Sequence, residues 1–216
     1  MTSHPKDLSD ELIDVMAHSK KICKHLHLPV QSGSSRILQK MNRHYTKEQY
    51  LELAERIRKA VPDISLTTDI IVGFPGETEE EFKTTCDFAK KVSFAQIHVF
   101  KYSRRHGTVA DRMEDQVDEQ VKNSRSDRLL AIEAELEKQY QQKFPDQTQK
   151  VLIEEPVLIE GTKYLVGYNE RYVRIAVPYE KGVSDESLCN SLIDVHINGS
   201  LEGDILLGKR ERACNL

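Results

Sequence analysis

Several absences narrow the classes of protein to which this 216-residue chain can belong. No stretch approaches the roughly 20 apolar residues that a bilayer-spanning helix needs. Residues 1–5 have no basic segment leading into an apolar one, so no secretory signal is expected. We therefore predict a cytoplasmic protein with no membrane partner.

Cysteine is scarce and scattered. The four cysteines, Cys23, Cys86, Cys189 and Cys214, share none of the short spacings of zinc or iron-sulfur sites. Thiols placed in this way in a protein of a reducing compartment are mostly reduced and structural. We predict that this chain itself supplies no metal ligands.

An excess of positive charge is also lacking, since 31 basic residues face 35 acidic ones. The imbalance lies in the last third, where 8 basic residues face 12 acidic ones from Asp146 onward. Overall charge therefore gives no indication of nucleic acid binding, and any such contact has to be local.

The first two-thirds of the chain alternate short apolar runs with longer periodic ones. Residues 26–30, 64–72 and 95–102 have the composition of strands. The segment 64–72 is rich in β-branched residues and contains a single acid, Asp69. Helices are expected between them, at 36–41, from Thr46 to Pro62, and after Thr78, because Thr46 with Gln49 and Thr78 with Glu81 have capping-box spacing. This order predicts part of a (β/α) barrel or an open α/β sheet.

A different pattern follows. Residues 118–144 are rich in Arg, Leu, Glu, Lys and Gln and predict one long polar helix that ends before Pro145. Short apolar segments separated by Gly, Asn and Pro then predict a small antiparallel β-barrel. The predicted divisions are an α/β domain over 1–115, a helical connector over 116–145 and a barrel over 146–216.

Function is carried by loop motifs, because this architecture alone specifies none. The segments at 3–7, 28–34, 41–46, 67–78 and 102–108 include Leu28-Pro29-Val30-Gln31-Ser32-Gly33-Ser34 and Gly73-Phe74-Pro75-Gly76-Glu77. In order and spacing they resemble the later barrel segments of the radical S-adenosylmethionine (SAM) methylthiotransferases of the MiaB and MtaB types.

The resemblance implies the second half of a TIM-like radical SAM barrel, followed by a small TRAM-type, OB-like barrel that grips tRNA. It also implies SAM and [4Fe-4S] clusters as cofactors of the complete enzyme, and the tRNA anticodon loop as a partner. The family's CxxxCxxC cluster motif is absent from this chain. We therefore expect a carboxyl-terminal fragment that needs a missing amino-terminal half and is inactive alone.

The resemblance further implies cofactor contacts from two strand ends. One set is Gln31, Ser32 and Ser34, whose alternative role is a loop and helix cap. The other is Asp69, Gly73 and Glu77, where the alternatives are a plain strand-to-helix turn and, for Asp69, a neighbouring Lys or Arg in the barrel interior.

Two histidines, His25 and His27, alternate on the first predicted strand, so both are expected to point to one face of the sheet. Strand histidines of this kind are more often hydrogen-bonded structural residues than catalytic or metal-binding ones. No catalytic residue is assigned from the sequence.

RNA contacts are expected in two places. Lys101, Arg104 and Arg105 form a basic cluster after the third strand, where phosphates could bind, although a solvated charge run is an equal alternative. In the small barrel, aromatic and guanidinium groups suited to stacking and phosphate binding are Tyr168, Arg171, Tyr172 and Arg174, although core or surface packing is an equal alternative.

The resemblance leaves the substrate open. Residues 3–7 and 28–30 look like MiaB, which acts on isopentenyl-adenosine, whereas 98–103 and 167–172 look like MtaB, which acts on threonylcarbamoyl-adenosine. We favour threonylcarbamoyl-adenosine beside the anticodon, because the later segments surround the substrate. The alternatives are a non-catalytic RNA-binding fragment and a relative that modifies a ribosomal protein.

Overall fold

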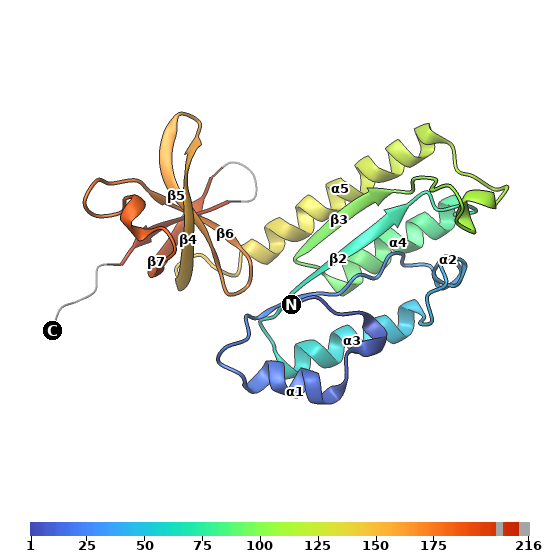
Figure 1. The fold of residues 1–216 in the computed structure, drawn as a ribbon, viewed down its shortest axis with the longest axis horizontal. Coiled ribbons are helices and arrows are strands. Elements are labelled where there is room, and N and C mark those ends of the chain that lie inside the picture. The colour runs from blue at the N-terminus through green and yellow to red at the C-terminus, as the bar shows by residue number, and fades with distance from the viewer. Residues whose placement is uncertain (202–204, 212–216) are drawn as a thin grey trace. The chain divides into compact units, whose positions relative to one another are not determined.

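The computed structural model describes residues 1–201 and 205–211, and the chain divides into two compact units, Met1–Glu137 and Lys138–Leu216 (Figure 1). Cys214 lies outside the described residues. The elements of the first unit are η1 (Pro5–Asp7), α1 (Asp10–His18), β1 (His25–His27), α2 (Ser35–Lys40), α3 (Lys47–Ala60), β2 (Ser65–Val72), α4 (Glu79–Val92), β3 (Gln96–Lys101), η2 (Ala110–Arg112) and most of α5 (Glu119–Gln141).

The first unit is built on a three-stranded parallel sheet in the order β1-β2-β3. Its strands agree with the α/β pattern predicted from the sequence, but β1 ends at His27 rather than at residue 30. Pro29 has no amide hydrogen for the ladder, and the amide of Val30 donates instead to the side chain of Thr68 at 2.9 Å. The pairing resumes at Gln31, whose amide donates to the carbonyl of Asp69 at 2.9 Å.

Side-chain caps fix the starts of the main helices. Both predicted capping boxes are present, at Thr46 with Gln49 and at Thr78 with Glu81. Each satisfies amide groups that the first helical turn leaves without an intrahelical partner. The sequence therefore predicts where α3 and α4 begin.

The two faces of the sheet differ. One face is apolar, because Leu66, Ile70 and Val72 of β2 pack with buried residues of α3 and α4 in the main core (Figure 1). The alternate positions, including Thr67 and Asp69, form what we call the open face. There Asp69 is only partly buried and His98 is exposed.

The second unit is a closed five-stranded barrel, with neighbours in the order β4-β5-β6-β8-β7. The predicted antiparallel arrangement is wrong at one pair, because β6 and β8 run parallel. A ring with an odd number of strands cannot alternate direction throughout, so closure requires a parallel pair. The strands are β4 (Thr148–Ile159), β5 (Thr162–Asn169), β6 (Arg174–Pro178), β7 (Leu192–Ser200) and β8 (Leu206–Arg210), with η3 (Glu186–Leu188) between β6 and β7.

Helix α5 belongs mainly to the first unit. Its buried residues Leu129 and Leu136 pack in the core of the sheet unit. The boundary between the two units falls within α5, after Glu137. The sequence predicts instead a separate connector over 116–145. Among the described helices, none combines the length and apolar character needed to cross a bilayer.

Candidate cofactor and substrate site

The carboxyl ends of the three parallel strands carry the predicted site. Gln31 follows β1, Gly73 follows β2 and Tyr102 follows β3. Parallel strands present their carboxyl ends at one edge of a sheet, and ligands of α/β proteins commonly bind there. The fold therefore brings the three loops to a common edge.

Gln31 is the most unusual residue at this edge. It has a φ of 70°, a left-handed conformation that is uncommon for residues other than glycine, and it is 8% exposed. Its side-chain amide makes no hydrogen bond to any described residue. A strained backbone with a free polar side chain is typical of a residue that meets a ligand.

Ser32 and Ser34 have partners within the fold. Ser32 Oγ accepts from the amide of Ser34 at 3.1 Å and lies 3.5 Å from Thr85 Oγ1. Ser34 caps α2 and donates to Glu81 Oε1 at 2.9 Å. Both hydroxyls therefore hold the loop against α4, the role given above as the alternative.

The turn at residues 73–77 is closed by its own glutamate. The amide of Gly73 donates to Glu77 Oε2 at 2.7 Å. Gly73 has a φ of 71°, and a Cβ there would lie 2.2 Å from Cγ of Lys122. Only glycine fits this position without strain, because both the backbone conformation and the space exclude a side chain.

A buried ion pair ties this turn to α5. Arg125 Nη1 lies 2.8 Å from Glu77 Oε2 and also donates to the Glu77 carbonyl at 3.1 Å. Both side chains are at most 5% exposed. Burial raises the pKa of Glu77, and the Gly73 amide and Arg125 act against that rise. Glu77 thus has a structural role in the fold.

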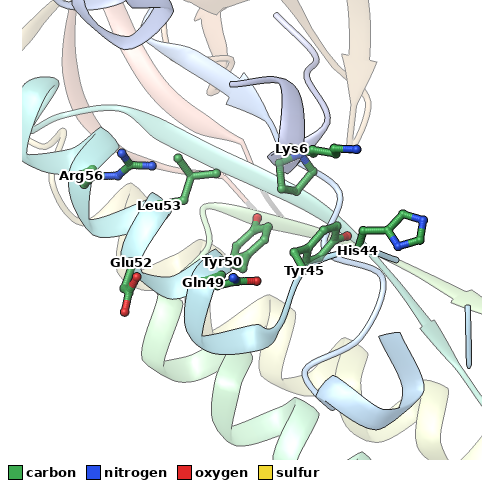
Figure 2. Close-up of a pocket in the computed structure, with 9 residues that line it drawn as sticks. Lys6, His44, Tyr45, Gln49, Tyr50, Glu52, Leu53 and Arg56 are labelled. Carbon is green, nitrogen blue, oxygen red and sulfur yellow. The ribbon is translucent and has the colours of Figure 1, made fainter. Parts of the chain in front are cut away.

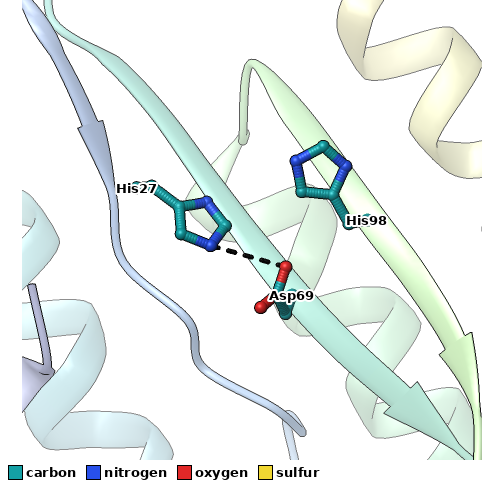
Figure 3. A group of neighbouring side chains, drawn as sticks. All are labelled: His27, Asp69 and His98. Carbon is teal, nitrogen blue, oxygen red and sulfur yellow. Dashed lines mark ion pairs between the residues drawn. The ribbon is translucent and has the colours of Figure 1, made fainter. Parts of the chain in front are cut away.

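Asp69 meets histidines on the open face. Asp69 Oδ1 lies 3.4 Å from Nε2 of His27, and Asp69 is in register with His98 on the neighbouring strand (Figure 3). No local sequence pattern indicates the role of His98, because neighbours across strands depend on register. A histidine therefore stands where the alternative hypothesis placed a Lys or Arg.

Thr67 links the two histidines of β1. Its hydroxyl lies 3.1 Å from His25 Nε2 and 3.0 Å from His27 Nδ1. Burial lowers the pKa of His25 to about 4, and the neighbouring N-terminus, His27 and His98 add electrostatically to the effect. His25 is therefore neutral at pH 7 and has a hydrogen-bonded, structural position.

The predicted basic cluster of the first unit is largely ion-paired. Lys101 donates to the side chain of Asn123 at 2.7 Å and lies 3.4 Å from Glu119. Arg104 lies 3.1 Å from Asp111. Arg105 is exposed. These contacts reduce the positive charge that the cluster offers to a phosphate.

In the barrel, the predicted RNA-binding residues lie near one another. The rings of Tyr168 and Tyr172 are 5.9 Å apart, and Arg174 is paired in register with Tyr168. Tyr172 is 60% exposed. Arg171 is mostly buried, with its guanidinium 5.9 Å from the ring of Phe144. The exposed aromatic surface is suited to base stacking.

A separate pocket of about 460 Å³ lies beside η1 and α3 (Figure 2). Its wall includes Tyr45 and Tyr50, whose hydroxyls donate to carbonyls of the 28–30 segment. Arg56 at its rim pairs with Asp10 at 2.7 Å. None of the predicted cofactor residues lines it.

The two implied cofactors fit these residues unequally. At the carboxyl edge, the hydroxyl of Tyr102 is buried without a hydrogen-bond partner among the described residues, as is Glu77 Oε1. Together with Gln31 these are polar groups that SAM could satisfy. The described cysteines do not fit a cluster, because the only grouping of three possible ligands among the described residues contains no sulfur.

Comparisons with known proteins show which proteins the chain is similar to. The radical SAM superfamily model matches residues 1–89. The chain is 48% identical over 95% of its length to a tRNA-2-methylthio-N(6)-dimethylallyladenosine synthase of Acetivibrio thermocellus. It is 55% identical over 72% of its length to a synthase of the same name from Lachnoclostridium phytofermentans. The chain is a partial match to the radical SAM methylthiotransferase family.

The methylthiotransferase resemblance predicted from the sequence is confirmed. The threonylcarbamoyladenosine tRNA methylthiotransferase MtaB of Bacillus subtilis is 44% identical over 82% of the chain. The chain spans 42%, 34% and 39% of the lengths of these three relatives.

A solved structure supports the radical SAM-type α/β fold. Coproporphyrinogen III oxidase HemN from Escherichia coli, a radical SAM enzyme, matches 62% of this chain and 31% of its own, with a TM-score of 0.53 and 20% identity. At this identity the likeness shows the fold alone.

Proposed function

We propose that this chain is part of an enzyme that adds a methylthio group to an N6-modified adenosine of tRNA. The observation that carries the proposal is the 48% identity to a tRNA methylthiotransferase over 95% of the chain. The gathering of three loops at the carboxyl edge of the sheet supports it, because that edge offers an unpaired amide and an unpaired hydroxyl.

For SAM, we propose Gln31 and the hydroxyl of Tyr102 as side-chain contacts, with Asp69 farther along the open face. Ser32, Ser34 and Gly73 shape the loops, since their polar groups bond within the fold. Glu77 also holds its turn through Oε2, while its Oε1, which has no partner among the described residues, stays available to SAM. Bound SAM supplies the radical and methyl chemistry of this family. Iron-sulfur ligands have to come from residues other than the described cysteines, so the chain alone is expected to be inactive.

For tRNA, we propose two contact areas. The exposed Arg105, with Lys101 and Arg104, is the phosphate contact of the sheet unit. The barrel, which we propose to be a TRAM-type domain, offers Tyr168 and Tyr172 for stacking, with Arg171 and Arg174 beside them. Binding that depends on phosphates weakens as salt is raised.

The two candidate substrates differ in polarity. Relatives at 48% and 55% identity are named for dimethylallyladenosine, and the one at 44% is named for threonylcarbamoyladenosine. The names favour the dimethylallyl substrate. The open face supports the threonylcarbamoyl group, because the imidazoles of His27 and His98 can donate to its carboxylate and Asp69 can accept from its hydroxyl. Our preference for threonylcarbamoyl-adenosine stays a prediction.

SAM binding tests the cofactor assignment. Equilibrium dialysis of the 216-residue chain with labelled SAM is expected to show binding that Gln31→Ala weakens and Gln39→Ala leaves unchanged, since Gln39 is exposed on α2. Equal binding by both variants would exclude Gln31 as a contact.

Gel shifts test the RNA assignment and the substrate. The chain is expected to bind anticodon stem-loops at low salt, and Tyr172→Ala is expected to weaken binding by about 1–3 kcal/mol. Leu192→Ala is the control, because Leu192 is also an exposed apolar residue of the barrel. Stem-loops carrying dimethylallyl or threonylcarbamoyl groups identify the preferred substrate. If neither SAM nor RNA binds, the proposed function is wrong.

A non-catalytic RNA-binding role is the second candidate, and the lack of a cysteine cluster among the described residues favours it. Reconstitution with iron and sulfide separates the two. We expect no cluster absorbance and no SAM cleavage by the chain alone. RNA binding without any SAM binding would support the second candidate over the first.

A further inference from the structure

The open face carries one possible metal ligand on each of its three strands. His27 lies on β1, Asp69 on β2 and His98 on β3 (Figure 3). One donor atom from each side chain lies within 4.8 Å of the other two. The residues come from positions 27, 69 and 98, so only the parallel pairing of the strands brings them together.

These distances are close to those of a metal shell. Bonds of about 2.0–2.2 Å to imidazole nitrogen and carboxylate oxygen place neighbouring ligand atoms roughly 3 Å apart and opposite ones roughly 4 Å apart. His27 Nε2 and Asp69 Oδ1 are already 3.4 Å apart. The His27 and His98 rings have centroids 5.6 Å apart. Because His98 is exposed, a rotation of its side chain is enough to bring the third donor atom nearer to the other two.

The hydroxyl of Thr67 orients the first ligand. It lies 3.0 Å from His27 Nδ1, so this nitrogen is occupied and Nε2 is the one directed to Asp69. Metal-binding histidines almost always use their second nitrogen in such a hydrogen bond, which fixes the ring and its tautomer. A histidine that only forms an ion pair with a carboxylate does not need a second hydrogen bond to fix its ring.

We propose that His27, Asp69 and His98 form a binding site for a divalent transition-metal ion. Two imidazoles and one carboxylate suit Fe²⁺, Co²⁺, Ni²⁺ or Zn²⁺, and they disfavour Mg²⁺ and Ca²⁺, which prefer oxygen ligands. With three protein ligands, the ion keeps open positions for water or an oxygen atom of a ligand. The site is separate from the thiolate-bound clusters of the family, because it contains no sulfur.

Cobalt titration tests the site directly. The chain, freed of metal by chelator, is titrated with Co²⁺ while its visible absorption is followed, and Zn²⁺ and Mg²⁺ are then added as competitors. We expect one Co²⁺ per chain, displacement by Zn²⁺ and none by equimolar Mg²⁺. Absence of a saturable one-to-one signal overturns the proposal.

Variants separate ligands from bystanders. His98→Ala is the decisive one, because His98 is exposed and its loss does not disturb the core; it is expected to weaken Co²⁺ binding more than about tenfold, as is Asp69→Asn. His106→Ala, at an exposed histidine outside the cluster, is expected to change nothing. Equal binding by the His98 and His106 variants would mean that the ion binds elsewhere.

Thr67 is a positioning residue, and its test uses a conservative pair. Thr67→Val is expected to weaken Co²⁺ binding by about 10–100-fold while the one-to-one stoichiometry persists, and Thr67→Ser is expected to restore it. If Val and Ser behave alike, the hydroxyl does not position His27. The titration uses neither SAM nor RNA, so its result is independent of the proposed function.

Discussion

The sheet unit and the barrel unit differ in how their β-strands are paired at the edges. In the barrel every strand has two neighbours, and the ring closes on itself. In the sheet unit β1 and β3 lie at the edges of a three-stranded sheet, and one face is covered by helices while the other carries polar side chains. Closure supplies the barrel with its own stability. The open sheet depends instead on contacts between its loops and helices.

Those contacts are polar and specific. The turn after β2 is held by Arg36, which donates to the carbonyl of Gly76 at 2.5 Å, and by Lys40, which pairs with Asp115 at 2.8 Å. The buried pair of Glu77 with Arg125 adds α5. The sheet unit therefore uses ion pairs to fix the loops that carry its site, whereas the barrel core is mainly aliphatic.

The largest expected effect comes from removing the buried guanidinium. Arg125→Met leaves the Glu77 carboxylate buried and without its cationic partner, which typically costs about 3–5 kcal/mol. Hydrogen exchange read by mass spectrometry should show loss of protection in β1, β2 and β3, with the barrel strands unchanged. An equal loss of protection in the barrel strands would show that the ion pair does not stabilise the sheet unit specifically.

Arg128→Met is the matched control for that experiment. Arg128 also lies over the ring of Phe82, but it is half exposed and pairs with Glu79 at the surface. Exposed pairs are worth at most about 1 kcal/mol. Adding Glu77→Gln to the Arg125 variant should recover part of the loss, because the unpaired charge is then removed.

An intermediate effect is expected in the barrel. Gly167→Ala places a Cβ 1.9 Å from the carbonyl oxygen of Leu152 and 2.8 Å from Cα of Ile153. Backbone atoms cannot move aside cheaply, so we expect a loss of about 1–3 kcal/mol, confined to the barrel in hydrogen exchange. Gly199→Ala is the control, since a Cβ there meets nothing within 4 Å. A barrel that tolerates both changes equally would contradict the close approach of β4 and β5.

How far the sequence predicts this molecule depends on whether a feature is local. The capping boxes of α3 and α4 and the bounds of β2 follow from residues within one turn or one strand, so they are predictable. The resemblance to the methylthiotransferases also follows from loop motifs, because several short segments recur in order. The strand-end position of Gln31 is predictable in the same way, although its positive φ is not.

Contacts across the chain are not predictable from local patterns. His98 meets Asp69 only through the register of β2 with β3, and Arg125 meets Glu77 across 48 positions. The parallel pair of β6 with β8 depends on the closure of five strands. In each case the contact depends on which residues become neighbours in the folded chain. Local periodicity and secondary-structure propensity carry no information about such neighbours. The buried ion pair of Glu77 with Arg125 is likewise invisible in the sequence, and the cofactor role of Glu77 stays a prediction.

The smallest effect is expected from the partly exposed ion pair of Arg36 with Glu81, in contrast to the buried pair of Arg125 with Glu77. Glu81 accepts hydrogen bonds from Arg36, Thr78 and Ser34, and these contacts, led by that from Arg36, lower its pKa to about 2. Because the folded-state pKa is below the unfolded value of about 4.3, the carboxylate stabilises the fold at neutral pH. That contribution is lost as pH falls from about 4.5 toward 2.

Glu81→Gln is therefore expected to cost about 1 kcal/mol at pH 7, a modest value because Arg36 is half exposed. Chemical denaturation at several pH values should show a constant difference from the wild type between pH 7 and 5 that shrinks below 4.5, since glutamine does not titrate. Glu80→Gln removes the same charge from the same helical turn and should show little difference at any pH. A Glu81 effect that persists undiminished at pH 3 would assign it to the helix cap rather than to the ionised contact with Arg36.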